Sequence, residues 1–212
     1  MRARIAFTAL WFAAVPLAAQ SHARIDITLP PPASFAELGP TVSTTNLLND
    51  PKTHELLNSG FSTRIHYRLE LWKHGGVFDD PVDTTGWDVL VSYDPTAQRY
   101  NVVRREDSHA IENFGGFPTV ELAEQQFDRP FRLGLHPTAR GRYYYALTVE
   151  IETLRESDLD ALQQWLRGPS SPSRGNPLKS LRTGLRTLLS RVLGGGKRVY
   201  GQRTGIFTVG GE

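Results

Sequence analysis

One segment of the chain, residues 61–71, alternates between apolar and polar side chains over its whole length. A β-strand turns successive side chains to opposite faces, so this pattern places one set on a buried face and the other on an exposed face. The expected buried residues are Phe61, Ile65, Tyr67, Leu69 and Leu71, and the outward residues are Arg64, His66, Arg68 and Glu70. Because a strand with one buried face is typical of an antiparallel sheet, this segment restricts the fold to a sheet-based one.

Further strands are expected on both sides of this segment, because apolar residues recur at alternate positions there. A turn at residues 94–97 joins two of them as a hairpin. Short helices are expected where a capping residue precedes a helical apolar pattern. The expected strands span 24–29, 41–48, 87–93, 99–103, 131–135, 142–153 and 199–209, and the expected helices are 51–59, 119–127 and one that begins at Ser157. The sequence thus predicts a mainly β fold with accessory helices (α+β), arranged as an antiparallel β-sandwich-like domain.

The N-terminus has the three parts of a secretory signal. Arg2 and Arg4 give it a positive start, residues 5–17 form an uncharged apolar run, and small residues follow. The run is shorter than the roughly 20 residues that a membrane-spanning helix needs. We therefore expect a cleavable signal peptide over the first 23 residues, cut after Ala19 or Ala23, and a protein exported to the periplasm or cell envelope.

The mature chain, residues 24–212, has the length of a single domain and contains no cysteine. An exported protein without cysteine folds without disulfides, so burial of apolar surface must stabilise it. The absence of cysteine also excludes thiolate metal sites and cysteine nucleophiles.

The charge of the mature chain is unevenly distributed. Acidic residues outnumber basic ones by eight over residues 24–160, whereas residues 161–211 hold nine basic residues and no acidic one. A loop rich in proline, serine and glycine, 168–176, leads to a predicted basic amphipathic helix, 177–193, before the final strand. The basic residues of this helix with which we associate a partner or membrane contact are Lys179, Arg182, Arg186 and Arg191.

Three interpretations of this helix remain open. Its leucines either cover a face of its own sheet, or lie on an anionic membrane surface, or contact another envelope protein. Nucleic acid is not an expected partner, because an acidic body repels phosphate.

A resemblance to a known family rests on several short runs. These are residues 57–61 leading into 67–72, the turn at 92–95 followed by Tyr100, and a closing stretch, 191–203, that ends in 206–209. Together they resemble a family of exported bacterial proteins known only as a domain of unknown function. In some bacteria that family is encoded beside a membrane sensor histidine kinase of the nitrogen-regulation type. The resemblance implies an exported accessory domain with no assigned catalytic residues.

Acidic residues gather in one segment that we expect to be a loop. Asp79, Asp80, Asp83 and Asp88 follow a Gly-Gly pair, and calcium prefers several oxygen ligands. Their spacing matches no EF-hand or aspartate repeat, and the nearby proline and glycine are ordinary turn residues. The sequence therefore favours a solvated loop over a metal site.

The remaining candidates for chemistry have simpler explanations. His66 and His74 lack zinc-site spacing, and the serines lack the G-x-S-x-G pattern of a nucleophile elbow. Glu150 and Glu152 resemble a catalytic pair, but alternate outward residues of a half-buried strand are the commoner case. The sequence predicts no catalytic residue, no cofactor and no metal.

The leading functional hypothesis is a non-enzymatic exported envelope protein that acts as an interaction or sensory accessory. The alternative is a carrier for a lipid or other apolar ligand. The aromatic residues Trp72, Trp87, Tyr143, Tyr144 and Tyr145 would supply apolar surface for such a ligand.

Overall fold

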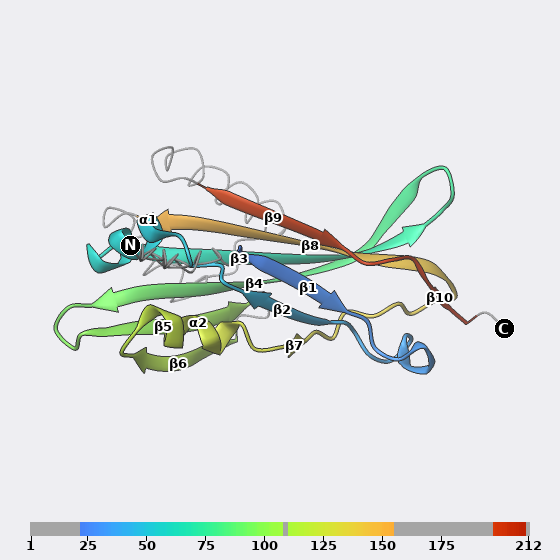
Figure 1. The fold of residues 1–212 in the computed structure, drawn as a ribbon. Helices are drawn as coiled ribbons and strands as arrows, with labels where there is room; N and C mark the ends of the chain where they lie inside the picture. The colour runs from blue at the N-terminus through green and yellow to red at the C-terminus, as the bar shows by residue number, and fades with distance from the viewer. Residues whose placement is uncertain (1–21, 108–109, 155–196, 211–212) are drawn as a thin grey trace, which may run out of the picture.

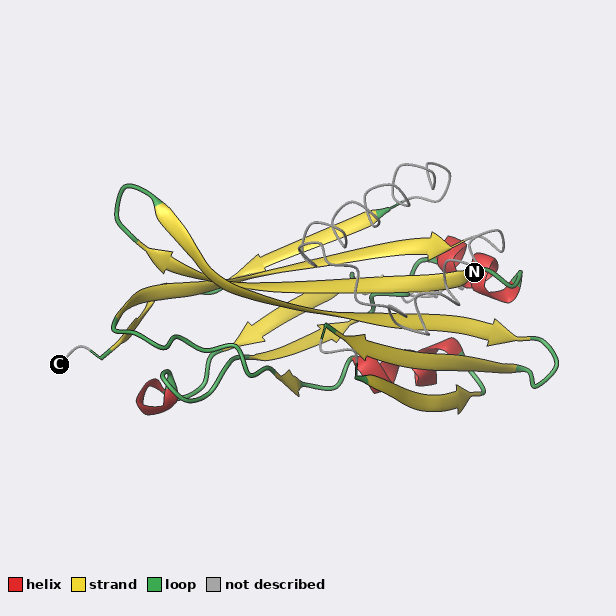
Figure 2. Cartoon of the chain, turned by 180° about the vertical axis from the view of Figure 1, so that it is seen from behind, coloured by secondary structure: helices red, strands yellow, loops and turns green. Residues whose placement is uncertain are grey.

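The computed structural model describes residues 22–107, 110–154 and 197–210. They form two antiparallel sheets with two short α-helices, so the prediction of a mainly β fold with accessory helices is confirmed (Figures 1 and 2). The elements in chain order are β1 (Arg24–Thr28), the 3-10 helix η1 (Pro32–Ser34), β2 (Thr41–Thr45), α1 (Pro51–Asn58), β3 (Ser62–His74), β4 (Asp79–Asp94), β5 (Arg99–Glu106), β6 (Ile111–Phe117), α2 (Val120–Phe127), β7 (Phe131–Arg132), β8 (Gly141–Leu154), β9 (Arg198–Arg203) and β10 (Phe207–Val209).

The larger sheet has seven strands in the order β10-β8-β3-β4-β5-β6, and β9 also pairs with β8. The predicted strand at 61–71 is its central strand β3, which pairs with β4 on one side and with β8 on the other. Ile65, Tyr67, Leu69 and Leu71 are at most 1% exposed, as the alternation predicted. Phe61, which was also predicted to be buried, precedes β3 and is only half-buried. The long alternating segments of the sequence are therefore the middle of this sheet.

The smaller sheet, in the order β1-β2-β7, contributes to the same hydrophobic cluster as the larger one. Ile25 of β1 and Val42 of β2 belong to this cluster together with the inward residues of β3, β4 and β8. One apolar core thus joins the two sheets and the helices beside them.

Both predicted helices within the described residues are confirmed. Helix α1 begins at Pro51, whose fixed φ suits the first turn, and the chain leaves it through Gly60 at a φ of 88°. Helix α2 follows Thr119, whose side-chain oxygen accepts a hydrogen bond from the amide of Leu122 at 3.3 Å. Proline and glycine thus mark the ends of α1, whose N-cap Asp50 makes no side-chain capping hydrogen bond, whereas a side-chain cap begins α2.

Thr119→Ala is expected to lower the free energy of unfolding by about 1 kcal/mol, because an amide of the first turn of α2 loses its acceptor. Urea denaturation of the purified protein measures the change. The control is Thr119→Asp, which keeps an acceptor and should stay close to the wild type. An equal loss in both variants would show that the cap does not stabilise the helix.

Four segments differ from their sequence-based expectation. β4 begins at Asp79 rather than at residue 87, because the acidic segment predicted to be a loop pairs with the far end of β3. Residues 111–117, where no strand was expected, form the edge strand β6. Only Phe131 and Arg132 of the predicted strand 131–135 pair, as β7.

The expected final strand, 199–209, is two strands, β9 and β10. Both pair with β8, but three residues, 204–206, stand opposite only Tyr144 and Tyr145. The extra residue interrupts the ladder, as a bulge does.

Candidate functional site

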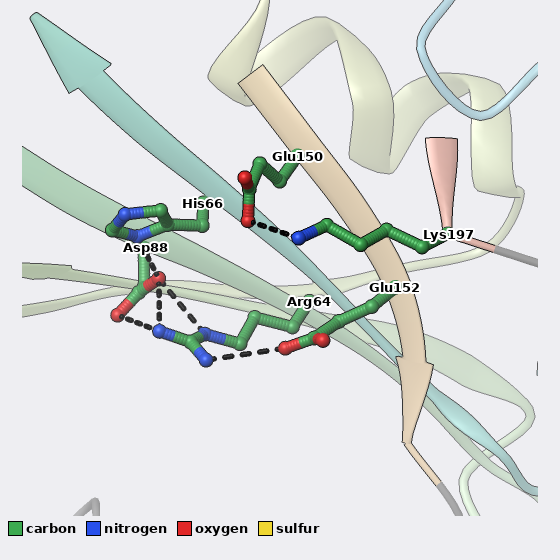
Figure 3. Close-up of polar contacts among 6 residues, drawn as sticks. All are labelled: Arg64, His66, Asp88, Glu150, Glu152 and Lys197. Atoms are coloured by element: carbon green, nitrogen blue, oxygen red, sulfur yellow. Dashed lines mark hydrogen bonds and ion pairs between the residues drawn. The ribbon is translucent and has the colours of Figure 1, made fainter. Parts of the chain in front are cut away.

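Six polar residues on the outward face of the larger sheet form two ion-paired groups, one of four residues around Arg64 and one pair, Glu150 with Lys197 (Figure 3). At the centre of the larger group, the Arg64 guanidinium donates to both carboxylate oxygens of Asp88, at 2.9 and 3.0 Å. It also donates to Glu152 Oε1 at 3.1 Å. The side chains of these three residues are only 12–13% exposed. Arg64 is therefore a half-buried cation held between two carboxylates, and we call these three residues the Arg64 triad.

Strand register explains why these residues meet. Arg64 lies directly opposite Glu152 of β8, and His66 lies opposite Asp88 of β4. All occupy the outward positions of the period-two pattern, so neighbouring strands bring their charges together. The outward placement of Glu150 and Glu152 agrees with the sequence-based prediction.

The other members of the group are also paired. His66 Nδ1 lies 2.9 Å from Asp88 Oδ1, and Lys197 Nζ lies 2.8 Å from Glu150 Oε2. Burial raises the pKa of Asp88, but the hydrogen bond from His66 and the charge of Arg64 outweigh it, so that this pKa lies below its ordinary value. A carboxylate that acts as a general acid needs the opposite shift. The group thus has the properties of a structural ion-pair network that joins three strands.

The histidines and aspartates considered as metal ligands lie in separate places. His66 contacts Asp88, whereas His74 Nδ1 lies 2.8 Å from Asp79 Oδ1 near the far end of β3. Among the residues that the structure describes, three or more potential ligands do not gather at one point. Asp83 stands opposite Leu71 and is exposed.

A second feature of the larger sheet is the end of the β3–β4 hairpin, which extends beyond the neighbouring strand β5 (Figure 2). β5 pairs with β4 only from residue 87 onward, so residues 79–86 have β3 as their strand partner. We call residues 75–83 the hairpin tip. Val77 is 85% exposed, Phe78 80% and Val82 46%. These three large apolar side chains give the hairpin tip an exposed apolar patch, a feature that is uncommon on the surface of soluble proteins.

Local chemistry shapes the hairpin tip. A Cβ atom on Gly75 would stand 2.3 Å from the carbonyl oxygen of Phe78, so the turn closes only with glycine there. Gly76 follows at a φ of 91°. Between Leu71 and Trp72 the register shifts, which leaves Val82 as an extra residue on β4. Such a bulge bends a hairpin and redirects its end.

Aromatic and ionic contacts hold the base of the hairpin tip, where β3 ends and β4 begins. The rings of Trp72 and Tyr144 are stacked, with centroids 6.3 Å apart and an interplanar angle of 3°. The Arg203 guanidinium lies 3.4 Å from the centroid of the Tyr144 ring, and Tyr144 Oη donates to Asp79 Oδ2 at 3.0 Å. A hydrogen bond from His74 lowers the pKa of Asp79. The base of the hairpin tip is therefore attached to β8 and β9, which limits its movement.

The interior holds a recess between β2, β3, β4, β5 and the α2–β7 segment. It is lined by Val42, Ser43, Thr44, Tyr67, Trp87, Val89, Arg104, Phe127, Arg129 and Phe131. The recess leaves space for little more than about one water molecule. Ligand pockets for lipids or drug-sized molecules are far larger, so this recess does not favour a carrier.

The basic residues associated with a partner or membrane contact, Lys179, Arg182, Arg186 and Arg191, lie outside the described residues. So do the loop 168–176, the helix 177–193, the helix expected from Ser157, and residues 1–21 of the expected signal peptide.

Sequence reasoning missed the hairpin tip. Its signal was a Gly-Gly pair followed by two apolar residues, Val77 and Phe78, inside a polar segment. Apolar residues in a turn lie outside the strands and so have no buried strand face to occupy. Such a pair in a predicted turn therefore indicates side chains that are exposed to solvent.

No protein-family model, curated protein or solved structure matches the chain. Within the described ranges, none of the helices has the length and apolar character required to cross a bilayer.

Proposed function

We propose that this protein is a non-enzymatic exported domain of the bacterial cell envelope that acts as an interaction or sensory accessory through its hairpin tip. One observation carries the proposal: Val77 and Phe78 stand at the end of a braced hairpin at 85% and 80% exposure. Exposing two large apolar side chains in water is unfavourable unless a partner covers them.

Export rests on the N-terminal sequence, with its positive start and short apolar run. A non-enzymatic role is supported by the carboxylates of the outward face, which are paired with Arg64 or Lys197. We take the two-sheet arrangement with a shared core to be sandwich-like.

Photo-crosslinking in cells tests the proposal. A photo-crosslinking phenylalanine derivative replaces Phe78 in the full chain, and a second variant carries the same derivative at Leu122, which is 39% exposed on α2. A discrete crosslinked product is expected from position 78 and not from position 122. Equal or absent products from position 78 would overturn the proposal.

A matched variant links that product to the apolar side chains. Val77→Ser with Phe78→Ser should change the free energy of unfolding by less than about 0.5 kcal/mol, because both residues are exposed. With the derivative moved to Val82, the same double variant should lose the crosslinked product. Retention of the product would show that the apolar pair does not make the contact.

A further inference from the structure

The charges beside the apolar pair restrict what the hairpin tip contacts. Asp80 and Asp83 are exposed, and Asp79 lies at the base of the tip. The tip contains no lysine or arginine, and Asp79 is already paired with His74 at 2.8 Å and with Arg203 at 3.9 Å. The tip is therefore an apolar point with two exposed carboxylates, Asp80 and Asp83, beside it.

An acidic surround disfavours a bilayer as the occupant. Anionic lipid surfaces attract lysine and arginine and repel carboxylates. Segments that lie in a membrane interface combine apolar side chains with basic ones. The hairpin tip has the apolar side chains with the opposite charge.

The rigidity of the hairpin favours a shaped protein pocket. Aromatic side chains, phenylalanine included, are enriched in the buried centre of protein interfaces. The Trp72–Tyr144 stack and the hydrogen bond from Tyr144 to Asp79 hold the base of the tip in place, which reduces the entropy lost on association. Carboxylates around such an anchor are best matched by cations around the pocket.

Resting on the proposed function, we infer that the hairpin tip docks into an apolar pocket of another protein, with Phe78 as the anchor and with lysine or arginine side chains at the rim facing Asp80 and Asp83. The apolar pair supplies affinity, and the carboxylates supply orientation and association rate.

The test reverses the charge at the tip of the full chain. The photo-crosslinking derivative stays at position 78 while Asp80→Lys and Asp83→Lys are introduced. The matched control carries Asp26→Lys and Glu37→Lys, two exposed positions outside the hairpin with the same change in net charge. We expect the yield of the crosslinked product to fall about tenfold in the tip variant, because like charges would then face each other, and to remain unchanged in the control.

A salt series and vesicles complete the test. The wild-type yield should fall as ionic strength rises, since salt screens exposed charge pairs. The purified protein should not sediment with vesicles of zwitterionic lipid, with or without added anionic lipid. Sedimentation with vesicles that depends on Phe78 would overturn the inference in favour of a lipid surface.

The outcomes separate the two proposals. A product from position 78 that persists after charge reversal overturns the cationic rim but leaves the interaction function standing. Both proposals are overturned if the chain that carries the derivative at position 78, with no other change, gives no crosslinked product and the purified protein does not bind vesicles. A product lost only in the tip variant supports both.

Discussion

Arg64→Ala is expected to lower the free energy of unfolding by about 3 kcal/mol. The guanidinium donates two hydrogen bonds to Asp88 and one to Glu152, and the three side chains are only 12–13% exposed. Removing the cation leaves two half-buried carboxylates beside each other, and the cost of their desolvation and repulsion is then uncompensated. Chemical denaturation at neutral pH measures the loss.

The matched control for this prediction is Arg68→Ala, on the same face of the same strand. Arg68 is 53% exposed and its Nε lies 3.5 Å from Glu70, so solvent screens the pair. We expect a loss below about 0.5 kcal/mol there. Comparable losses at Arg64 and Arg68 would contradict the buried Arg64 triad.

A rescue variant isolates the charge effect. Asp88→Asn and Glu152→Gln, added to Arg64→Met, remove all three charges of the triad while roughly keeping their volume. This triple variant should be more stable than Arg64→Ala, because no uncompensated charge then remains among the three positions. A triple variant less stable than Arg64→Ala would show that packing, rather than charge, dominates at this place.

Asp128→Asn is expected to raise the free energy of unfolding at pH 8. Asp128 follows α2, and its Oδ1 accepts a hydrogen bond from Thr44 of β2 at 2.6 Å. Burial raises the pKa of Asp128 to about 7, and the nearby carboxylate of Glu124 adds to the rise. Glu124 itself is 8% exposed and accepts from the amide of Leu48 at 2.8 Å, and burial raises its pKa as well. Two carboxyl groups thus tie α2 to β2 and the following loop.

The sign of the pH dependence follows from these shifts. Between pH 3.8 and about 7 the folded chain holds a proton on Asp128 that the unfolded chain has released. Stability therefore falls as pH rises through this window, and the full cost is present above it. The raised pKa of Asp128 corresponds to a cost in the free energy of unfolding, which we reduce because the side chain is partly exposed. Asp128→Asn should therefore raise the free energy of unfolding by about 2 kcal/mol at pH 8, because a neutral amide still accepts the hydrogen bond from Thr44.

Denaturation at a series of pH values between 4 and 8 measures this effect. The wild type should lose stability across the series, and Asp128→Asn should show a shallower slope with a smaller remaining contribution from Glu124. The control is Glu121→Gln, at an exposed position in the first turn of the same helix. It removes a carboxylate that favours the helix N-terminus, so a slight loss of stability is expected, while the part of the slope due to Asp128 stays unchanged. A steep slope in Asp128→Asn would contradict the assignment.

Much of the fold was predictable because its signals are local. The alternation at 61–71 identified β3 and its buried face, and the apolar residues of 142–153 identified β8 in the same way. Proline at position 51 and glycine at position 60 placed α1, and the helical spacing of the apolar residues within 119–127 placed α2. Each of these signals depends on the period of side chains along a backbone or on the geometry of one turn.

Segments without such a signal were misread. β6 contains Gly115 and Gly116 and presents an exposed edge, so its sequence has no regular alternation. The first part of β4 contains Pro81 and three aspartates, a composition that favours a loop. Both segments are strands because the preceding strand of the same hairpin supplies their hydrogen bonds, whatever their own composition favours.

The sequence by itself determined which residues of the long strands are buried, where the helices begin, and that no cysteine chemistry takes place. Only the tertiary structure decided that Arg64 meets Asp88, 24 residues away, and Glu152, 88 residues away. It also decided that Val77 and Phe78 stay exposed. The reason is physical: periodicity is a property of one strand, whereas ion pairing and exposure depend on the register between strands and on which segment covers a side chain.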